Sequence, residues 1–153
     1  MRSTTTFNCH SGVTFIELVI TVVIVAILAL SAHPAYQHAL VQVRRAEAKS
    51  ALYAVLLQQE RFYTLHGTYF AFDADTPDST FKWWSGNAAE SSYYEIQAGP
   101  CPGRSLSECV LISAIPGTDR VHKHEDADCG NYLIDSSNNK SNSVSTASNS
   151  LCW

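Results

Sequence analysis

A single carboxylate interrupts the longest apolar run of the sequence. The run from Val13 to Ala32 reads VTFIELVITVVIVAILALSA, and Glu17 is its one charged residue. About 20 apolar residues in a helix span a bilayer core, and a charge inside such a segment costs about 3 kcal/mol unless it finds a partner. The chemistry open to Glu17 is therefore ion pairing with a cation brought next to it.

A peptide cut between Gly12 and Val13 would supply that cation as a new α-amine. Glu17 would then lie one helical turn inside the new terminus, where the helix dipole favours an anion. Among packed helices, the carboxylate could pair with the amine of a neighbouring subunit and set the axial register between them. The plainer alternative places Glu17 at the level of the lipid headgroups, at the end of a membrane helix.

The apolar run differs from a cleaved secretory signal, because it is too long for one. A lipoprotein signal would place its cysteine after the run, whereas Cys9 precedes it. An uncleaved signal anchor stays open as an alternative. Against it stand Ser11-Gly12 directly before the run, Glu17 near its start, Pro34 just after its end, and a helical pattern that continues beyond it.

The remaining four cysteines all follow the apolar run. Four cysteines in a small domain beyond a membrane segment indicate two disulfides in an oxidising compartment. Metal ligation is the competing interpretation, but the sequence holds no C-x-x-C pair. Three pairings are open to four cysteines. We predict the two local pairs, Cys101–Cys109 and Cys129–Cys152.

Catalytic chemistry has little support in the sequence. It contains no nucleophile elbow and no metal-binding motif, so we predict no enzyme, no catalytic residues, no cofactor and no metal site. One candidate for a divalent cation is a histidine pair beside acidic residues. In a turn, such residues are expected to be solvated charges; they are His122, His124, Glu125, Asp126 and Asp128.

Charge also argues against bulk attraction to nucleic acid, because 10 Lys and Arg face 14 Asp and Glu for a formal net charge of −4. Lys82 beside Trp83-Trp84 is a fragment of the basic, aromatic surface that DNA binding needs, but direct DNA binding is not expected of an acidic domain. The aromatic residues near Trp83 could form an adhesive surface. We favour the alternative that they cover the helix or pack between subunits.

One long helix must position these residues. No Gly or Pro interrupts the chain between Pro34 and Gly67. Apolar or uncharged residues recur in steps of four and three, which marks one helical face: Ala48, Leu52, Val55, Gln59 and Phe62. The pattern predicts a helix from about Val13 to about Tyr63, roughly 75 Å long, with a kink at Pro34. A coiled coil is the alternative, but no strict heptad is sustained.

The expected organisation has four parts: a leader at 1–12, a hydrophobic transmembrane and assembly helix at 13–33, its amphipathic continuation at 34–66, and a globular head at 67–153. In the head, turn residues separate three predicted strands, namely Tyr93–Ala98, Cys109–Ile115 and Asn131–Asp135. The stretch Ser136–Ser150 is too polar to order itself. The fold class is α+β, a long N-terminal helix packed on a small antiparallel sheet.

The segment Gly12-Val-Thr-Phe-Ile-Glu17 resembles the class III signal of type IV prepilins. The stretches Gln59–Tyr63 and Cys129-Gly130 resemble the PilE-like group of minor pilins within that family. The resemblance implies the pilin fold, cleavage after Gly12 and methylation of Val13. It also implies an assembly role for Glu17, a helix kink at Pro34 and a Cys129–Cys152 disulfide around the C-terminal region.

Two departures from the family pattern are visible. Val13 stands where the family usually has Phe, and Asn138-Asn139 stands where it often has a turn Gly. Asn tolerates left-handed turn conformations nearly as well as Gly, so we expect a turn at the same place.

The function implied by the resemblance is that of a structural subunit of a type IV pilus. A minor pilin for pilus assembly is favoured, with roles in twitching motility, adhesion or DNA uptake. Its partners would be the prepilin peptidase/N-methyltransferase and other pilins in a helical filament. It would start in the inner membrane with a periplasmic head and end in the extracellular pilus. The alternatives are a major pilin, a type II secretion pseudopilin and a membrane-anchored extracytoplasmic binding protein.

Overall fold

The computed structural model describes residues 12–77, 80–144 and 152–153. The chain divides into two compact units, residues 1–39 and residues 40–153. One helix, α1 (Phe15–His66), contributes to both units, and all four strands belong to the second. We describe each unit by itself.

Helix α1 follows the predicted span closely. It runs from Phe15 to His66, and the helical assignment continues through Pro34. The kink expected at Pro34 stays a prediction. The helix stops at Gly67, whose φ is +71° and whose N–H donates to the Tyr63 carbonyl at 2.8 Å. A glycine in the left-handed conformation is a common way to end a helix, so the predicted stop is confirmed.

In the first unit, the large apolar side chains of residues 13–30 are exposed. Between Val13 and Leu30 the exposed fraction of the large apolar side chains ranges from 39% at Val19 to 83% at Phe15. Among the residues that the structure describes, no helix combines the length and the hydropathy that a membrane crossing requires.

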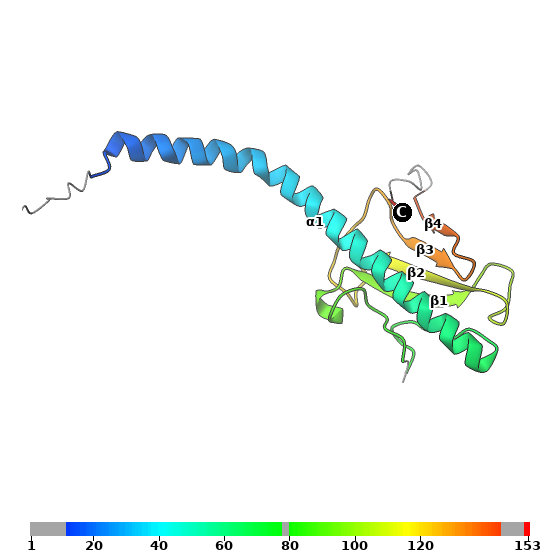
Figure 1. Cartoon of the computed structure of the whole chain (residues 1–153). Helices are drawn as coiled ribbons and strands as arrows, with labels where there is room; N and C mark the ends of the chain where they lie inside the picture. The colour runs from blue at the N-terminus through cyan, green and yellow to red at the C-terminus, as the bar shows by residue number, and fades with distance from the viewer. Residues whose placement is uncertain (1–11, 78–79, 145–151) are drawn as a thin grey trace, which may run out of the picture. The chain divides into compact units, whose positions relative to one another are not determined.

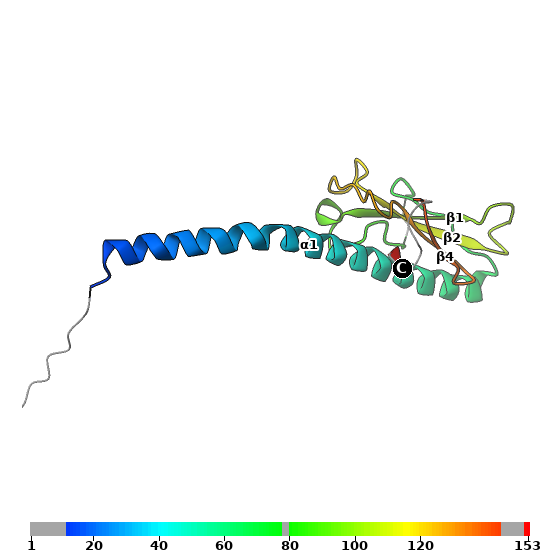
Figure 2. The same cartoon turned by 90° about the horizontal axis from the view of Figure 1, so that it is seen from above.

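The second unit, which includes the predicted head at 67–153 and is called the head from here on, consists of two layers, the second half of α1 and an antiparallel sheet. The strands are β1 (Tyr94–Pro100), β2 (Val110–Pro116), β3 (Tyr132–Asp135) and β4 (Lys140–Asn142), ordered β1-β2-β3-β4. The helix crosses one face of this sheet (Figure 1), and the sheet covers only one side of the helix (Figure 2). The predicted α+β plan is confirmed.

The core lies between these two layers. The predicted inner face of the helix is confirmed, because Ala48, Leu52, Val55 and Gln59 are all buried. Alternate residues of the strands meet this face, as the two-residue period of a strand requires. They are Tyr94, Ile96, Ala98, Val110, Ile112, Ala114, Tyr132 and Ile134.

Gln59 is the polar member of this face and holds the chain that follows the helix. Its Nε2 donates to the Phe70 carbonyl at 2.7 Å, and its Oε1 accepts from the Phe70 N–H at 2.9 Å. The nitrogen and the oxygen of the Gln59 side-chain amide are thus both hydrogen-bonded in the core, as buried polar groups need to be. The pair fastens the loop after Gly67 back onto α1.

The aromatic residues of this loop cover the helix and the edge of the sheet. Phe72 and Phe81 are buried, and Trp83 packs against the same core. Phe72 bridges Ala98, and Trp84 bridges Glu95, on the outer side of β1. These bridges protect an otherwise open strand edge. These residues cover the helix, which is one part of the favoured interpretation. Packing between subunits concerns a second chain and stays a prediction.

The polar stretch after β3 is more ordered than the sequence predicts. Strand β4 pairs with β3 in the register Leu133↔Ser141, so part of the stretch expected not to order itself is a strand. The backbone hydrogen bonds between β3 and β4 order this stretch, although its side chains bury little surface. The turn before β4 is the one expected, because Asn138 adopts a left-handed φ of 63°. Residues 145–151 lie outside the described residues.

Strands β1 and β2 each end on a proline, Pro100 and Pro116. Pro100 pairs with Val110, and Tyr94 pairs with Pro116. A proline lacks the N–H that a strand interior needs, but the end of a strand tolerates it. The two strands are therefore joined by a short connection that the Cys101–Cys109 disulfide closes.

Gly117, the residue after β2, generates a stability prediction. Its φ is +62°, and a Cβ there would lie 2.7 Å from the His124 backbone nitrogen and still closer to the His124 carbonyl oxygen. We expect Gly117→Ala to lower the free energy of unfolding by more than about 2 kcal/mol, because strain and steric overlap add. Denaturation of the full chain in detergent, followed by circular dichroism, measures the loss.

Gly67→Ala is the matched control for this substitution. Gly67 has nearly the same φ, +71°, but no atom lies within 4 Å of the added Cβ. We expect Gly67→Ala to lower the free energy of unfolding by about 1–2 kcal/mol, the cost of the left-handed backbone conformation alone. Equal losses in the two variants would show that the close approach of Gly117 to His124 has no energetic weight.

Candidate functional site

The start of α1 presents the predicted cleavage and assembly residues. Gly12 and Val13 are exposed and precede the helix. The Glu17 carboxylate accepts from the Thr14 N–H at 3.3 Å and from the Thr14 hydroxyl at 3.4 Å. The Thr14 hydroxyl in turn accepts from the Glu17 N–H at 3.4 Å. This reciprocal arrangement is a capping box.

The capping box adds a local role for Glu17 that the sequence reasoning missed. The signal was present as the spacing Thr14-x-x-Glu17, which is typical of a helix start. The carboxylate is held at the N-terminal end of α1 and is exposed. Its role in subunit register concerns a second chain and stays a prediction.

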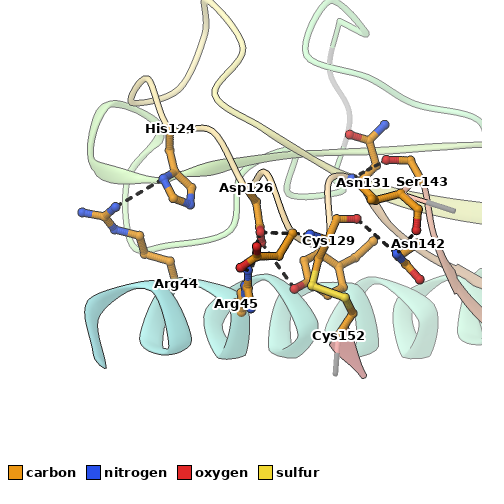
Figure 3. Close-up of polar contacts among 12 residues, drawn as sticks. Arg44, Arg45, His124, Asp126, Cys129, Asn131, Asn142, Ser143 and Cys152 are labelled. Atoms are coloured by element: carbon orange, nitrogen blue, oxygen red, sulfur yellow. Dashed lines mark hydrogen bonds and ion pairs between the residues drawn. A yellow bond between two sulfur atoms is a disulfide. The ribbon is translucent and has the colours of Figure 1, made fainter. Parts of the chain in front are cut away.

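A second polar site lies in the head, where α1 meets the loop between β2 and β3. Arg45 forms a bidentate ion pair with Asp126, with its Nε at 2.9 Å from Oδ2 and its Nη2 at 2.5 Å from Oδ1. The exposed fractions of the two side chains are 7% and 0%. Arg45 also reaches Asp128 at 2.9 Å. Figure 3 shows this pair beside the Cys129–Cys152 disulfide.

Three elements of the head converge on the Asp126 carboxylate. The Tyr94 hydroxyl of β1 donates to Oδ2 at 2.9 Å, and the Tyr132 hydroxyl of β3 reaches it at 3.4 Å. The Cys129 N–H donates to Oδ1 at 3.2 Å. A buried charge is tolerated only when it is paired and hydrogen-bonded, and Asp126 meets both conditions.

These contacts determine the ionisation of the groups involved. Burial alone would raise the pKa of Asp126, but hydrogen bonds from Arg45, Tyr94 and the Cys129 N–H outweigh it, so the pKa lies below its ordinary value. The hydrogen bond to Asp126 raises the pKa of Arg45 against the effect of burial. Burial and the charge of Asp126 raise the pKa of Tyr94. The site is therefore an ion pair with neutral tyrosines.

The C-terminal region is fastened next to this site. The structure contains the disulfides Cys101–Cys109 and Cys129–Cys152, the two local pairs. The Asn142 side chain donates to the Cys129 carbonyl at 3.4 Å, and the indole of Trp153 donates to the Ser141 carbonyl at 2.9 Å. The end of the chain thus returns to β4 and the helix.

A surface next to this region combines cations with aromatic rings. The Lys140 Nζ lies 5.4 Å from the Tyr53 ring centre and 5.7 Å from that of Trp153. Lys49 Nζ lies 5.7 Å from the Tyr132 ring. We call Lys49, Tyr53, Lys140 and Trp153 the cation–aromatic patch. Sequence reasoning missed it, since it joins α1, β4 and the C-terminus.

Sequence reasoning also missed Arg45 and Asp126. Asp126 was expected to be a solvated charge, and this was wrong because Arg45 pairs with it in the core. The signal available was the position of Arg45, three residues before Ala48 and thus on the buried face of the helix. Over the residues that the structure describes, no group of three or more His, Cys, Asp or Glu could hold a metal ion.

Two protein families match the chain. Residues 34–133 match the family described as "Type IV minor pilin ComP, DNA uptake sequence receptor". The chain belongs to this family. Residues 7–32 match the prokaryotic N-terminal methylation motif, a stretch that includes Gly12, Val13 and Glu17. The resemblance to type IV minor pilins is confirmed, and the protein is a minor pilin subunit of type IV pili.

Two solved structures are similar to this minor pilin. A type IV pilin from Shewanella oneidensis is 24% identical, with 73% of this chain and 96% of that chain covered and a TM-score of 0.43. The non-core minor pilin PilV from Neisseria meningitidis is 17% identical, with 69% and 89% covered and a TM-score of 0.45. No curated protein sequence matches the chain significantly.

The buried ion pair of this minor pilin generates a second stability prediction. Arg45→Met should lower the free energy of unfolding by about 3–5 kcal/mol at neutral pH, because Asp126 is left buried without a cation. The depressed pKa of Asp126 contributes stability that is present above the ordinary carboxyl value and is lost as pH falls through the lowered one. The difference in the free energy of unfolding between wild type and Arg45→Met should therefore become smaller below about pH 4.

Arg120→Met is the matched control, because its ion pair with Asp75 is solvent-exposed, with exposed fractions of 45% and 72%. Exposed pairs contribute less than about 1 kcal/mol. Denaturation of the full chain in detergent at several pH values compares the two variants. Similar small losses in both would mean that the Arg45–Asp126 pair does not hold the head together.

Proposed function

We propose that this minor pilin is made as an inner-membrane precursor, cut after Gly12, methylated on Val13 and assembled into a pilus through its N-terminal helix. The observation that carries the proposal is the match of residues 7–32 to the N-terminal methylation motif. The exposed position of Gly12 and Val13 ahead of α1 supports it, since a protease needs access to the peptide bond.

The apolar surface of residues 13–30 supports assembly through this helix. Its large apolar side chains are exposed, and an extended apolar surface of this kind marks contact with a membrane or with other proteins. In the precursor the contact is with lipid, and in the filament it is with the same helix of neighbouring pilins. The prepilin peptidase/N-methyltransferase and other pilins are the partners this proposal needs.

Glu17 is proposed to set the register of that packing. The capping box holds its carboxylate at the helix N-terminus, where the α-amine of an adjacent processed subunit can approach. Inside an apolar filament core, an amine and a carboxylate attract strongly, and each unpaired charge is costly. Subunits are therefore stable only at the axial positions that bring the two groups together.

The head is proposed to lie in the periplasm before assembly and on the extracellular pilus afterwards. Its two disulfides suit an oxidising compartment. We infer a structural subunit that acts by assembly and binding and is not an enzyme. The family description, a pilin and a receptor, supports this inference.

Processing and assembly can be tested together in cells that make pili. Mass spectrometry of tagged subunits recovered from filaments should find a chain that begins at methylated Val13. Glu17→Val should be processed in the same way but incorporated at least about tenfold less, since a register contact worth about 1.4 kcal/mol or more is lost. Subunits in filaments that keep residues 1–12 would refute the proposal.

Thr14→Ala is the control that separates register from capping. It removes the hydroxyl of the capping box but keeps the Glu17 carboxylate. Near-normal incorporation of Thr14→Ala beside failure of Glu17→Val supports the register role. Equal failure of both variants would instead assign Glu17 to capping its own helix.

A second candidate function is contact with DNA through the head, favoured by the name of the family as a DNA uptake sequence receptor. The formal net charge of −4 provides no bulk attraction, so the contact has to be local. We propose the cation–aromatic patch for it. Lys49 and Lys140 can contact phosphates, and Tyr53 and Trp153 offer ring faces beside them.

Fluorescence polarisation of a labelled DNA duplex with the full chain in detergent tests this role. We expect Lys140→Gln to weaken binding several-fold and to reduce the slope of log affinity against log salt by about one. Lys123→Gln is the matched control, an exposed lysine 3.8 Å from Asp119, and should bind as wild type does. Equal weakening by both variants, or no binding at low salt, would exclude the patch.

A further inference from the structure

The loop between β2 and β3, residues 117–131, is attached to α1 by two consecutive helix residues. Arg45 holds Asp126, as described above. Arg44 holds His124 through a contact of 3.3 Å between its Nη1 and the His124 Nδ1. Figure 3 shows the two arginines side by side, each facing its own loop residue.

The Arg44 contact fixes the protonation state of His124. A guanidinium can only donate hydrogen bonds, so the His124 Nδ1 has to accept. His124 is therefore neutral, with its proton on Nε2. That Nε2 is buried, and among the described residues it has no hydrogen-bond partner. The contact exists only for this one form of the ring.

The charged side chains nearest to His124 are mostly cationic and would destabilise a positive charge on its ring. From α1 it faces Arg44 and Arg45. The ring centres of Tyr93, just before β1, and of Tyr94, the first residue of β1, lie 5.6 and 5.9 Å from that of His124. From its own loop it is influenced by His122 and Asp126. Asp126 opposes the cations, but its oxygens already accept from Arg45, Tyr94, Tyr132 and the Cys129 N–H.

Burial, and then the charge of Arg44, lower the pKa of His124, while Asp126 partly opposes them. Protonation would also reverse the hydrogen bond. The new Nδ1–H would point at the N–H groups of Arg44, so that two donors and two positive charges would face each other. The charged form of His124 is thus incompatible with the contact to Arg44.

We propose that His124 is a pH-sensitive latch that joins the β2–β3 loop to α1 when neutral and frees residues 123–125 from the helix when protonated. Asp126 stays on Arg45, because its carboxylate keeps all of its donors. Release is also limited on the other side, since the His122 N–H donates to the Ser92 carbonyl at 2.8 Å and the Gly117 N–H donates to the Tyr93 carbonyl at 3.1 Å. The opened segment is therefore short and reclosable.

The direction of the pH effect follows from the lowered pKa. The latch contributes stability that is fully present above the ordinary histidine value near 6.5 and is lost as pH falls toward the lowered value. Between these two values, opening should increase about tenfold for each pH unit. The latch is closed at neutral pH and opens in acid.

The test uses the full chain in detergent. NMR of histidine-labelled protein should show His124 titrating below the ordinary value. Hydrogen exchange of the 117–131 segment, corrected for intrinsic rates, should rise in acid. The rise should be about tenfold for each pH unit between the ordinary histidine value and the measured midpoint of His124. His124→Gln keeps an acceptor for Arg44 without a titrating group, so its loop exchange should not change with pH.

His122→Gln is the matched control, because His122 is exposed in the same loop and should leave the acid response intact. Arg44→Met should raise the His124 midpoint and increase loop exchange at neutral pH. Three results would overturn the proposal. The rise of loop exchange in acid could survive in His124→Gln, it could disappear in His122→Gln, or His124 could titrate at the ordinary histidine value.

Discussion

The buried pair of Arg45 and Asp126 is the interaction on which the arrangement of the head depends. Removing two charges from water is costly, and replacement by apolar residues often stabilises a protein. What the pair adds is position, because the carboxylate also accepts from Tyr94, Tyr132 and the Cys129 N–H. Any shift of the helix, of two strands or of the disulfide-bounded region would break one of these bonds.

This constraint also explains why the C-terminal region can be polar and still be ordered. Strand β4 has little apolar surface of its own, but Cys129 is fixed by Asp126 and linked to Cys152. Trp153 then closes the region by bonding to the Ser141 carbonyl. The solvent-facing surface of this region thereby gains a defined shape.

Local patterns in the sequence were enough to predict much of this fold. The buried helix face from Ala48 to Gln59, the stop at Gly67 and the left-handed turn at Asn138 follow from periodicity and turn chemistry. Asp126 and the cation–aromatic patch could not be predicted in this way. Their environment is created by segments far apart in the chain, and a charged loop residue looks the same whether it is solvated or paired.

The hydrogen bonds between Gln59 and the loop after α1 have a consequence for the substitutions that this loop tolerates. The side-chain amide bonds only to the N–H and C=O of Phe70, which every residue except proline offers. These two bonds therefore do not depend on the side chain at position 70, whereas the Phe70 ring adds a separate contact by stacking on Phe81, with ring centres 5.7 Å apart. A substitution at position 70 by any residue but proline would therefore keep the loop bonded to α1 and would change only the contacts of the ring.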